Sequence, residues 1–445
     1  MMLNVYCPEK VSNEIRWLFL DILNPFMDCF GDIFIHEHEN VTVVGDDGGG
    51  ISFDVSALLV ESEQWLEGKW RHHWQEIEVD ELSLDEETKK KLSSTVPVIK
   101  SSSEYDYLSS LFFLLSRYEE ALDYEGDRFD RFSSEQCSHR PWLDQPIADE
   151  IKWIFFGLLK KGWPELKVPH SEFRIVPSHD IDHPSIYFAS PLWRHCFGVA
   201  RHGAPLKAAL CWVISIFGVR NRLVDPYDTL EWIIQESDKR GLQSAFYYIP
   251  IQTHDKKDPP VNMESERLRV QWANIDESGH EIGLHPGFET YQNNDLICKS
   301  KETLQLALRK AGLEHVCVQG GRQHYLRWKT PQTAQLWAKA GMQYDSTLGF
   351  ADKVGFRCGT CFPYKMYDVV ERTPIALVQR PLVLMDCSLM NRAYEGLGRG
   401  PRALEKAVKL KEACKKVGGE FTLLWHNTRL IRNDERRLYL SILDA

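Results

Sequence analysis

A chain of 445 residues is too long for one ordinary hydrophobic core, so we expect two domains. The formal charge of −11 and the lack of a basic block argue against nucleic acid as a partner. No signal peptide is expected in the first twenty residues, because the charged residues Glu9 and Glu14 interrupt them. No apolar stretch reaches the ~20 residues that span a bilayer, so no integral membrane segment is expected. Eleven scattered cysteines are typical of reduced thiols, which predicts a cytoplasmic protein.

Residues 1–167 are predicted to form a separate N-terminal α+β domain without an obvious catalytic constellation. Short β-branched runs indicate strands, and apolar residues at helical spacing indicate helices. The expected elements are strands at Ile33–His36, Val41–Val44 and Ile51–Val55 and helices at Tyr105–Leu122 and Ile147–Leu159. Asp127–Phe132 interleaves Asp and Arg with phenylalanine, and we interpret it as an ion-pair network on the surface.

Residues 168–445 show a more regular alternation of strands and helices. Strand-like runs occur at Phe173–Val176, Ser244–Ile251, Glu281–Leu284, His315–Val318, Met342–Tyr344, Ala376–Met385 and Glu420–Trp425. Helix-like stretches, several with Pro near the start and Gly past the end, separate most of them. This pattern predicts a parallel α/β sheet, most simply closed as a barrel. An insertion near 190–222 is expected to be helical and packed on the barrel, with a membrane-surface helix as the alternative.

Two aspartates directly follow the first of these strands. In an extended chain Asp180 and Asp182 point the same way, and adjacent carboxylates repel unless a cation or a proton separates them. The pair fits a solvated acidic turn, the cation-binding Asp-x-Asp of a glycosyltransferase, or a hydrolase that uses one Asp for metal and one for protons. The pair alone does not choose among these three interpretations.

Other strand ends also carry polar side chains. His285, Arg322, Asp345 and His426 each follow or end a predicted strand. In a barrel the carboxyl ends of the strands meet at one face, so these groups are expected to converge. Asp and His together suit zinc or another divalent transition metal.

Four motifs in order resemble the polysaccharide deacetylases of carbohydrate esterase family 4. They are the Asp-x-Asp pair, Gly279–His285 (GHEIGLH), the arginine motif at Gly320–His324, and Leu423–Asn427 (LLWHN). The resemblance extends from about Phe173 to the C-terminus. Tyr344–Phe350 and Gly355–Cys361 also resemble segments of bacterial members. Upstream, Ser116–Glu120 (SRYEE) and Asp127–Phe132 are similar to a domain of unknown function that precedes this catalytic domain in some bacterial proteins.

The resemblance implies a distorted (β/α)7 barrel that removes acetyl groups from an N- or O-acetylated carbohydrate with a divalent metal, zinc being the expected one. Such a reaction belongs to bacterial polysaccharide metabolism. Carried over by position, Asp180 is the general base, Asp182 and His285 are metal ligands, Arg322 orients Asp180, and His426 is the general acid.

One position departs from the family pattern. The family's second motif places another histidine four positions after the first, where this chain has Glu289. Glu289, His183 and His324 are the candidates for the third metal ligand. The alternative function is therefore a carbohydrate-binding or assembly protein that kept the barrel and lost a ligand. A glycosyltransferase fits less well, because no segment resembles a nucleotide-binding half.

Overall fold

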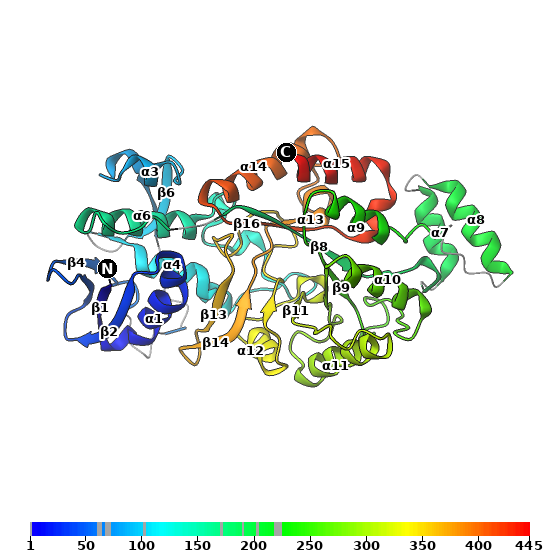
Figure 1. Ribbon diagram of the computed structural model, residues 1–445, viewed down its shortest axis with the longest axis horizontal. Coiled ribbons are helices and arrows are strands. Elements are labelled where there is room, and N and C mark those ends of the chain that lie inside the picture. The colour runs from blue at the N-terminus through cyan, green and yellow to red at the C-terminus, as the bar shows by residue number, and fades with distance from the viewer. Residues whose placement is uncertain are drawn as a thin grey trace.

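The computed structural model describes residues 2–445 except 60–64, 67–72, 101–103, 170–171, 189–190, 202–203 and 218–224. The N-terminal region (residues 1–167) lies at one end of the elongated molecule, and a nine-stranded sheet lies in the middle (Figure 1). A helical hairpin of α7 (Leu192–Arg201) and α8 (Pro205–Ile216) protrudes at the other end. None of the helices in these described ranges combines the length and the apolar character needed to cross a bilayer.

Two small sheets form the β part of the N-terminal region. The first has the order β2-β1-β3-β4 and the second the order β5-β6-β7. Their strands are β1 (Leu3–Pro8), β2 (Phe30–His36), β3 (Asn40–Val44), β4 (Gly50–Asp54), β5 (Trp74–Glu78), β6 (Thr95–Lys100) and β7 (Tyr105–Asp106). The strands predicted at Val41–Val44 and Ile51–Val55 are confirmed as β3 and β4, which pair in antiparallel fashion.

The helices of this region cover the sheets with apolar faces. They are α1 (Ser12–Trp17), α2 (Asn24–Met27), α3 (Glu86–Lys89), α4 (Tyr107–Ser116), α5 (Tyr118–Ala121) and α6 (Ile147–Gly162). The single helix predicted over Tyr105–Leu122 is wrong in two respects, because Tyr105–Asp106 form the strand β7 and the helix is divided at Arg117. Arg117 adopts a left-handed backbone (φ 55°) that ends α4, and its buried guanidinium donates to the carbonyl of Leu114.

A nine-stranded sheet organises the C-terminal region. Its order is β13-β14-β12-β11-β10-β9-β8-β16-β15, and every neighbouring pair is parallel except β13 with β14. The strands are β8 (Arg174–Ile181), β9 (Ala245–Tyr248), β10 (Glu281–Leu284), β11 (Gly320–Gly321), β12 (Tyr344–Asp345), β13 (Tyr364–Asp368), β14 (Thr373–Gln379), β15 (Leu384–Met385) and β16 (Glu420–Leu424). The mixed α/β class is therefore confirmed. Among the described residues no strand ladder joins β13 to β15, so the pairing does not close the predicted barrel.

The fourth strand lies later in the chain than the apolar pattern predicts. The run His315–Val318 is not a strand, and β11 consists of Gly320 and Gly321. A side chain on Gly321 would overlap the carbonyl of Leu284 in β10, and one on Gly320 would overlap the ring of Tyr344. Close approach of neighbouring strands therefore selects glycine here, which a search for apolar residues misses.

Helices connect most of these strands. They are α9 (Leu230–Asp238), α10 (Glu266–Glu277), α11 (Asn294–Lys310), α12 (Gln332–Lys339), α13 (Asp386–Met390), α14 (Pro401–Val417) and α15 (Asn433–Asp444). The predicted insertion near 190–222 is helical in its described part, as α7 and α8. Its residues 190, 202–203 and 218–222 lie outside the described ranges.

The two regions share one continuous hydrophobic core. Trp17 of α1 packs against Tyr367 of β13, with the ring centroids 5.0 Å apart. A buried ion pair also joins them: the Glu120 carboxylate accepts hydrogen bonds from Arg117 and, at 2.8 and 2.9 Å, from Arg357. Burial alone would raise the pKa of Glu120, but Arg357 and Arg117 lower that pKa to about 2.

We expect Glu120→Gln to destabilise the protein by about 3–5 kcal/mol, because it leaves the buried guanidinium of Arg357 without a countercharge and Arg117 with Glu119 alone. Urea unfolding at neutral pH measures this change. The matched control is Glu135→Gln, which removes the exposed pair with Arg140 and is expected to cost less than about 1 kcal/mol. Equal losses in the two variants would contradict the assigned role of Glu120.

The same group gives a pH dependence. Because the pKa of Glu120 is lower in the folded protein than its ordinary value of 4.5, its ionised form stabilises the fold. This contribution is complete above about pH 4.5 and is lost as the pH falls toward 2.

Candidate metal centre

The strand β8 carries both aspartates of the Asp-x-Asp pair to one cavity. Asp180 is the second-last residue of β8 and Asp182 follows its end. Both line a cavity of about 270 Å³. His179, one position before Asp180, is turned away from them, and its Nδ1 contacts the carbonyl of Trp425. The expectation that the two carboxylates point the same way therefore agrees with the structure.

Three histidines present an Nε2 atom to the carboxylate of Asp182. The distances from the nearer carboxylate oxygen of Asp182 are 3.4 Å to His285, 3.7 Å to His324 and 3.8 Å to His426. His285, His324 and His426 come shortly after β10, β11 and β16, respectively, which are three strands of one sheet. Oδ1 of Asp182 is buried and makes no hydrogen bond within the described part of the chain.

Each of these imidazoles is held through its other nitrogen. Nδ1 of His285 donates to the carbonyl of Arg322 at 2.6 Å. Nδ1 of His324 contacts the Asp258 carboxylate at 2.7 Å, and Nδ1 of His426 contacts Asp386 at 2.8 Å. When Nδ1 carries the proton of a neutral imidazole, Nε2 has a free lone pair, which is the form that binds metals. The rings of His285 and His324 are therefore oriented with their acceptor atoms toward Asp182.

Asp182, His285 and His324 together fit a divalent metal. One ligand atom from each lies within 4.8 Å of the others. Ligand atoms about 2.1 Å from a tetrahedral zinc ion lie roughly 3.4 Å apart, close to the two distances from Asp182. Burial would raise the pKa of Asp182, but the facing imidazoles hold it below its usual range, so the carboxylate is ionised as a ligand must be.

Asp180 lies beside this group and is fixed by Arg322. The buried Arg322 donates from Nη1 to Asp180 Oδ1 at 2.8 Å. The remaining guanidinium nitrogens donate to the hydroxyls of Ser178 and Ser346 and to the carbonyl of Ser346. Oδ2 of Asp180 is left facing the cavity, 3.6 Å from Nε2 of His285. This arrangement leaves one carboxylate oxygen available to accept a proton.

His426 lines the same cavity and is paired with Asp386. The Asp386 carboxylate also accepts the backbone N–H of His426 at 2.9 Å. Burial would lower the pKa of His426, but the Asp386 carboxylate raises it well above its usual value. His426 is therefore held as a proton donor.

The structure separates the three candidates for the third ligand. His324 lies in the group with Asp182 and His285, whereas His183 lines the cavity outside it. Glu289 is exposed, and its carboxylate faces Arg327 at 3.6 Å. The turn at Gly287 accounts for the position of Glu289. A side chain at position 287 would crowd Asp258 and Thr253, and the backbone N–H of Glu289 donates to the Thr253 hydroxyl.

The N-terminal region contributes to the same cavity. Arg131 lines it, is buried, and donates to the carbonyl of Tyr325 at 2.9 Å. The interpretation of Asp127–Phe132 as a surface ion-pair network holds only in part: Arg131 pairs with Asp127 at 2.6 Å, and Arg128 and Asp130 are exposed, but Arg131 itself is buried at the cavity. Tyr325 and Leu326 have left-handed backbones, with φ 63° and 56°, directly after the candidate ligand His324.

Sequence reasoning missed Asp258 and Asp386. Asp386 follows the buried run Val383–Met385, so the rule that polar residues mark strand ends would have found it. Asp258 lies in a loop without such a signal. It is buried and accepts hydrogen bonds from Thr253, His254 and Phe288 in addition to His324.

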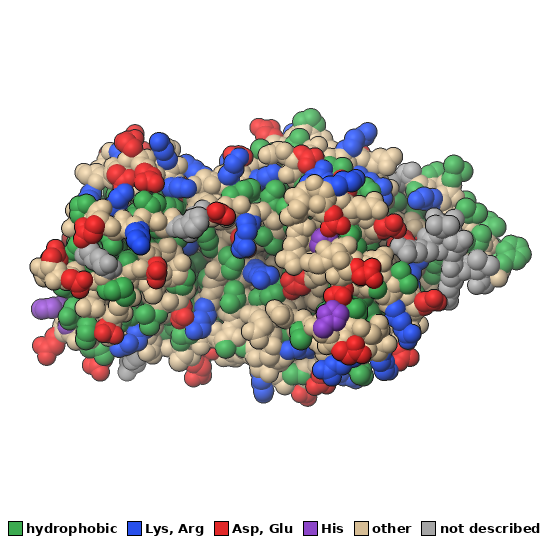
Figure 2. Space-filling view, viewed as in Figure 1, with side chains coloured by type: hydrophobic (Ala, Val, Ile, Leu, Met, Phe, Trp, Pro, Cys, Tyr) green, Lys and Arg blue, Asp and Glu red, His purple; other side chains and the backbone are tan. Residues whose placement is uncertain are grey.

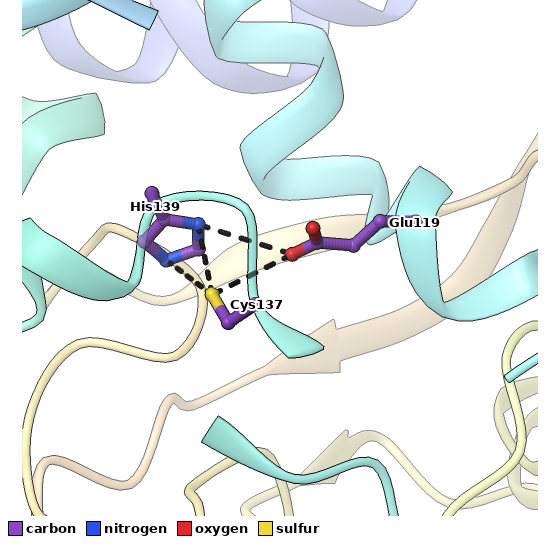
Figure 3. A group of neighbouring side chains, drawn as sticks. All are labelled: Glu119, Cys137 and His139. Atoms are coloured by element: carbon purple, nitrogen blue, oxygen red, sulfur yellow. Dashed lines mark hydrogen bonds and ion pairs between the residues drawn. The ribbon is translucent and has the colours of Figure 1, made fainter. Parts of the chain in front are cut away.

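A second cluster, Glu119, Cys137 and His139, also brings metal-binding side chains together (Figure 3). Cys137 Sγ lies 3.2 Å from Nδ1 of His139 and 3.7 Å from Glu119 Oε1. The guanidinium of Arg117 already contacts the same Glu119 oxygen at 3.1 Å. Because a positive charge is present there and burial raises the pKa of Cys137 well above its usual value, the cluster is a poor cation site.

Comparison with known proteins leaves the family of the whole chain open. A model described as a family of unknown function, DUF7033, matches residues 3–164. No curated protein matches the sequence. Similar solved structures include proteins described as polysaccharide deacetylases from Mycobacterium smegmatis (18% identity, 62% of this chain, 83% of that chain, TM-score 0.41) and Pseudomonas aeruginosa PAO1 (14%, 61%, 83%, 0.35). An allantoinase is also similar (14%, 61%, 83%, 0.33). Similarity at this level carries no conclusion about function.

We expect Asp258→Asn to weaken zinc affinity about 10- to 100-fold, because His324 would lose the carboxylate that orients its ring. Competition with a zinc-sensitive chelator measures the affinity. The matched control is Asp276→Asn, which removes a carboxylate from the surface residue His315 and should leave zinc affinity unchanged. An unchanged affinity in Asp258→Asn would remove His324 from the proposed ligand set.

Proposed function

We propose that the chain is a metal-dependent hydrolase that removes acetyl groups from an N- or O-acetylated carbohydrate. The observation that supports it most is the convergence of Asp182, His285 and His324 between an arginine-held Asp180 and an aspartate-held His426. A proton acceptor, a metal-binding group and a proton donor in one cavity are the parts that acyl hydrolysis needs. Zinc is the metal we expect from the ligand types.

The protein's own groups divide the reaction between them. A divalent ion bound here supplies Lewis-acid polarisation of the acetyl carbonyl and lowers the pKa of water. Oδ2 of Asp180 takes the proton of the attacking water, while Arg322 orients that carboxylate through a hydrogen bond to its Oδ1. Nε2 of His426 donates a proton to the departing amine or alkoxide, and Asp386 holds the ring in position.

The carbohydrate substrate rests on the sequence resemblance and on the chemistry of the cavity. Tyr325 and Tyr394 offer aromatic faces, and Asn391 and Lys257 offer polar groups in the same cavity wall. Such a mixture suits a sugar, which has apolar ring faces and hydroxyl groups. The distorted (β/α)7 barrel and a place in bacterial polysaccharide metabolism belong to this proposal. So does a cytoplasmic location, which the eleven free thiols, all in described residues, support.

The binding-only alternative depended on a missing third ligand. Because His324 offers an imidazole at that position, the arrangement favours hydrolysis over a barrel that has lost its metal. No observation in the described ranges favours the glycosyltransferase.

We expect the zinc-loaded protein to release acetate from N-acetylated or O-acetylated oligosaccharides. Asp180→Asn and His426→Gln should each lower kcat at least about 100-fold, because each removes a proton-transfer group. Enzymatic measurement of acetate, with zinc content determined in parallel, checks this.

His183→Gln is the matched control, because His183 lines the same cavity outside the ligand group. We expect it to retain most of the activity. A zinc-loaded protein that binds both kinds of oligosaccharide but releases no acetate would contradict the proposal and identify a binding protein instead.

A further inference from the structure

The α7–α8 hairpin exposes an unusual amount of apolar surface. It holds half of the large hydrophobic side chains that are exposed in the described part of the chain. They are Trp193, Phe197, Leu206, Leu210, Trp212, Val213, Ile216 and Phe217. Leu206 is 86% exposed and Phe217 is 77% exposed. Figure 2 shows hydrophobic side chains gathered at this protruding end of the molecule.

The exposed side chains are not needed to hold the hairpin together. Cys196 and Val199 of α7 pack against Ala208 and Cys211 of α8 in a small core of their own. Ile186 and Tyr227 join that core and connect the hairpin to the rest of the protein. Among the described residues, apolar side chains on the outer faces of both helices are left exposed, and an apolar patch of this kind marks an interaction site.

The charge of this segment indicates what the partner is. Residues 183–224 contain no Asp or Glu and five Lys or Arg, in a chain whose net charge is −11. Arg194, Arg201 and Lys207 are exposed on the hairpin itself. A second copy is disfavoured as the partner, because a symmetric dimer brings identical patches together and like charges repel.

We propose that the α7–α8 hairpin docks on the surface of an anionic lipid bilayer. Tryptophan and phenylalanine beside Lys and Arg are the residues that lie at the boundary of headgroups and acyl chains. Phosphate headgroups neutralise the basic side chains, and Leu206 and Phe217 enter the apolar layer. The twelve residues of α8 span only about 18 Å, so the helix lies on the bilayer rather than crossing it.

The hairpin also borders the candidate metal centre. A cavity of about 590 Å³ is lined by Arg194 and Val199 of α7 and shares His183 and Asn391 with the metal-site cavity. Docking therefore brings the reaction centre next to the membrane surface. This part of the inference rests on the proposed hydrolase function. The geometry then indicates a saccharide carried at a membrane as the substrate class.

Co-sedimentation with vesicles tests the docking. The full-length chain should bind vesicles of equal parts phosphatidylcholine and phosphatidylglycerol at least about tenfold more tightly than pure phosphatidylcholine vesicles, and salt should weaken the binding. The double variant Leu206→Ser/Phe217→Ser and the double variant Arg201→Gln/Lys207→Gln should each lose at least about tenfold in affinity for the mixed vesicles.

The matched control is Leu306→Ser/Val370→Ser, which removes two exposed apolar side chains outside the hairpin and should leave binding unchanged. Absence of vesicle binding, or equal losses in all three variants, would overturn the proposal. So would a dimer in solution that Leu206→Ser/Phe217→Ser converts to a monomer without any vesicle binding. The assay needs no hydrolysis, so a chain that binds vesicles but releases no acetate refutes only the proposed hydrolase.

Discussion

The structure of the site depends on one carboxylate, that of Asp182, whose partly buried side chain faces three imidazole nitrogens. Its Oδ1 atom is itself buried, and no hydrogen bond satisfies this atom among the described residues, which is costly for a charged group. The surrounding groups are arranged for a cation instead, because His285, His324 and His426 each direct Nε2 inward. Their outward nitrogens contact a carbonyl or a carboxylate, which fixes the ring orientation before any metal binds.

The N-terminal region holds the loop that carries one of these imidazoles. Left-handed backbones at Tyr325 and Leu326 cost roughly 1–3 kcal/mol each and persist only where neighbours hold them. Arg131 contacts the carbonyl of Tyr325, and Arg327 donates to the carbonyl of Phe129 at 3.0 Å. A region without catalytic groups of its own thus supports the position of His324. The buried pair of Glu120 and Arg357 joins the same two regions elsewhere.

Much of this arrangement could be read from the sequence because strands end where the polar residues begin. The rule predicted that Asp180, Asp182, His285, Arg322, Asp345 and His426 would meet. Asp180, Asp182, His285 and His426 line one cavity and Arg322 contacts Asp180, whereas Asp345 does not line that cavity and accepts a hydrogen bond from Thr347. Their roles stay predictions. The rule did not predict β11, because close backbone approach selects Gly320 and Gly321 rather than apolar residues. Nor did it find Asp258, whose loop position depends on tertiary contacts that no local pattern encodes.

The proposed third ligand shows the limit of reasoning by motif position. Glu289 occupies the family's position in the sequence, but it is exposed and faces Arg327, whereas His324, from a different strand end, lies in the group with Asp182 and His285. Cys387 lies with Asp386 and His426 in a third group of metal-binding side chains. This group and the one around Cys137 each hold a thiol, whereas the group around Asp182 holds only oxygen and nitrogen ligands.

X-ray absorption at the zinc edge of protein loaded with one equivalent of zinc therefore tests the central claim most directly. We expect oxygen and nitrogen neighbours at about 2.0–2.1 Å, with the outer-shell scattering of two imidazoles and no sulfur. A sulfur neighbour at about 2.3 Å would contradict the account, because it would place the metal at one of the thiol clusters.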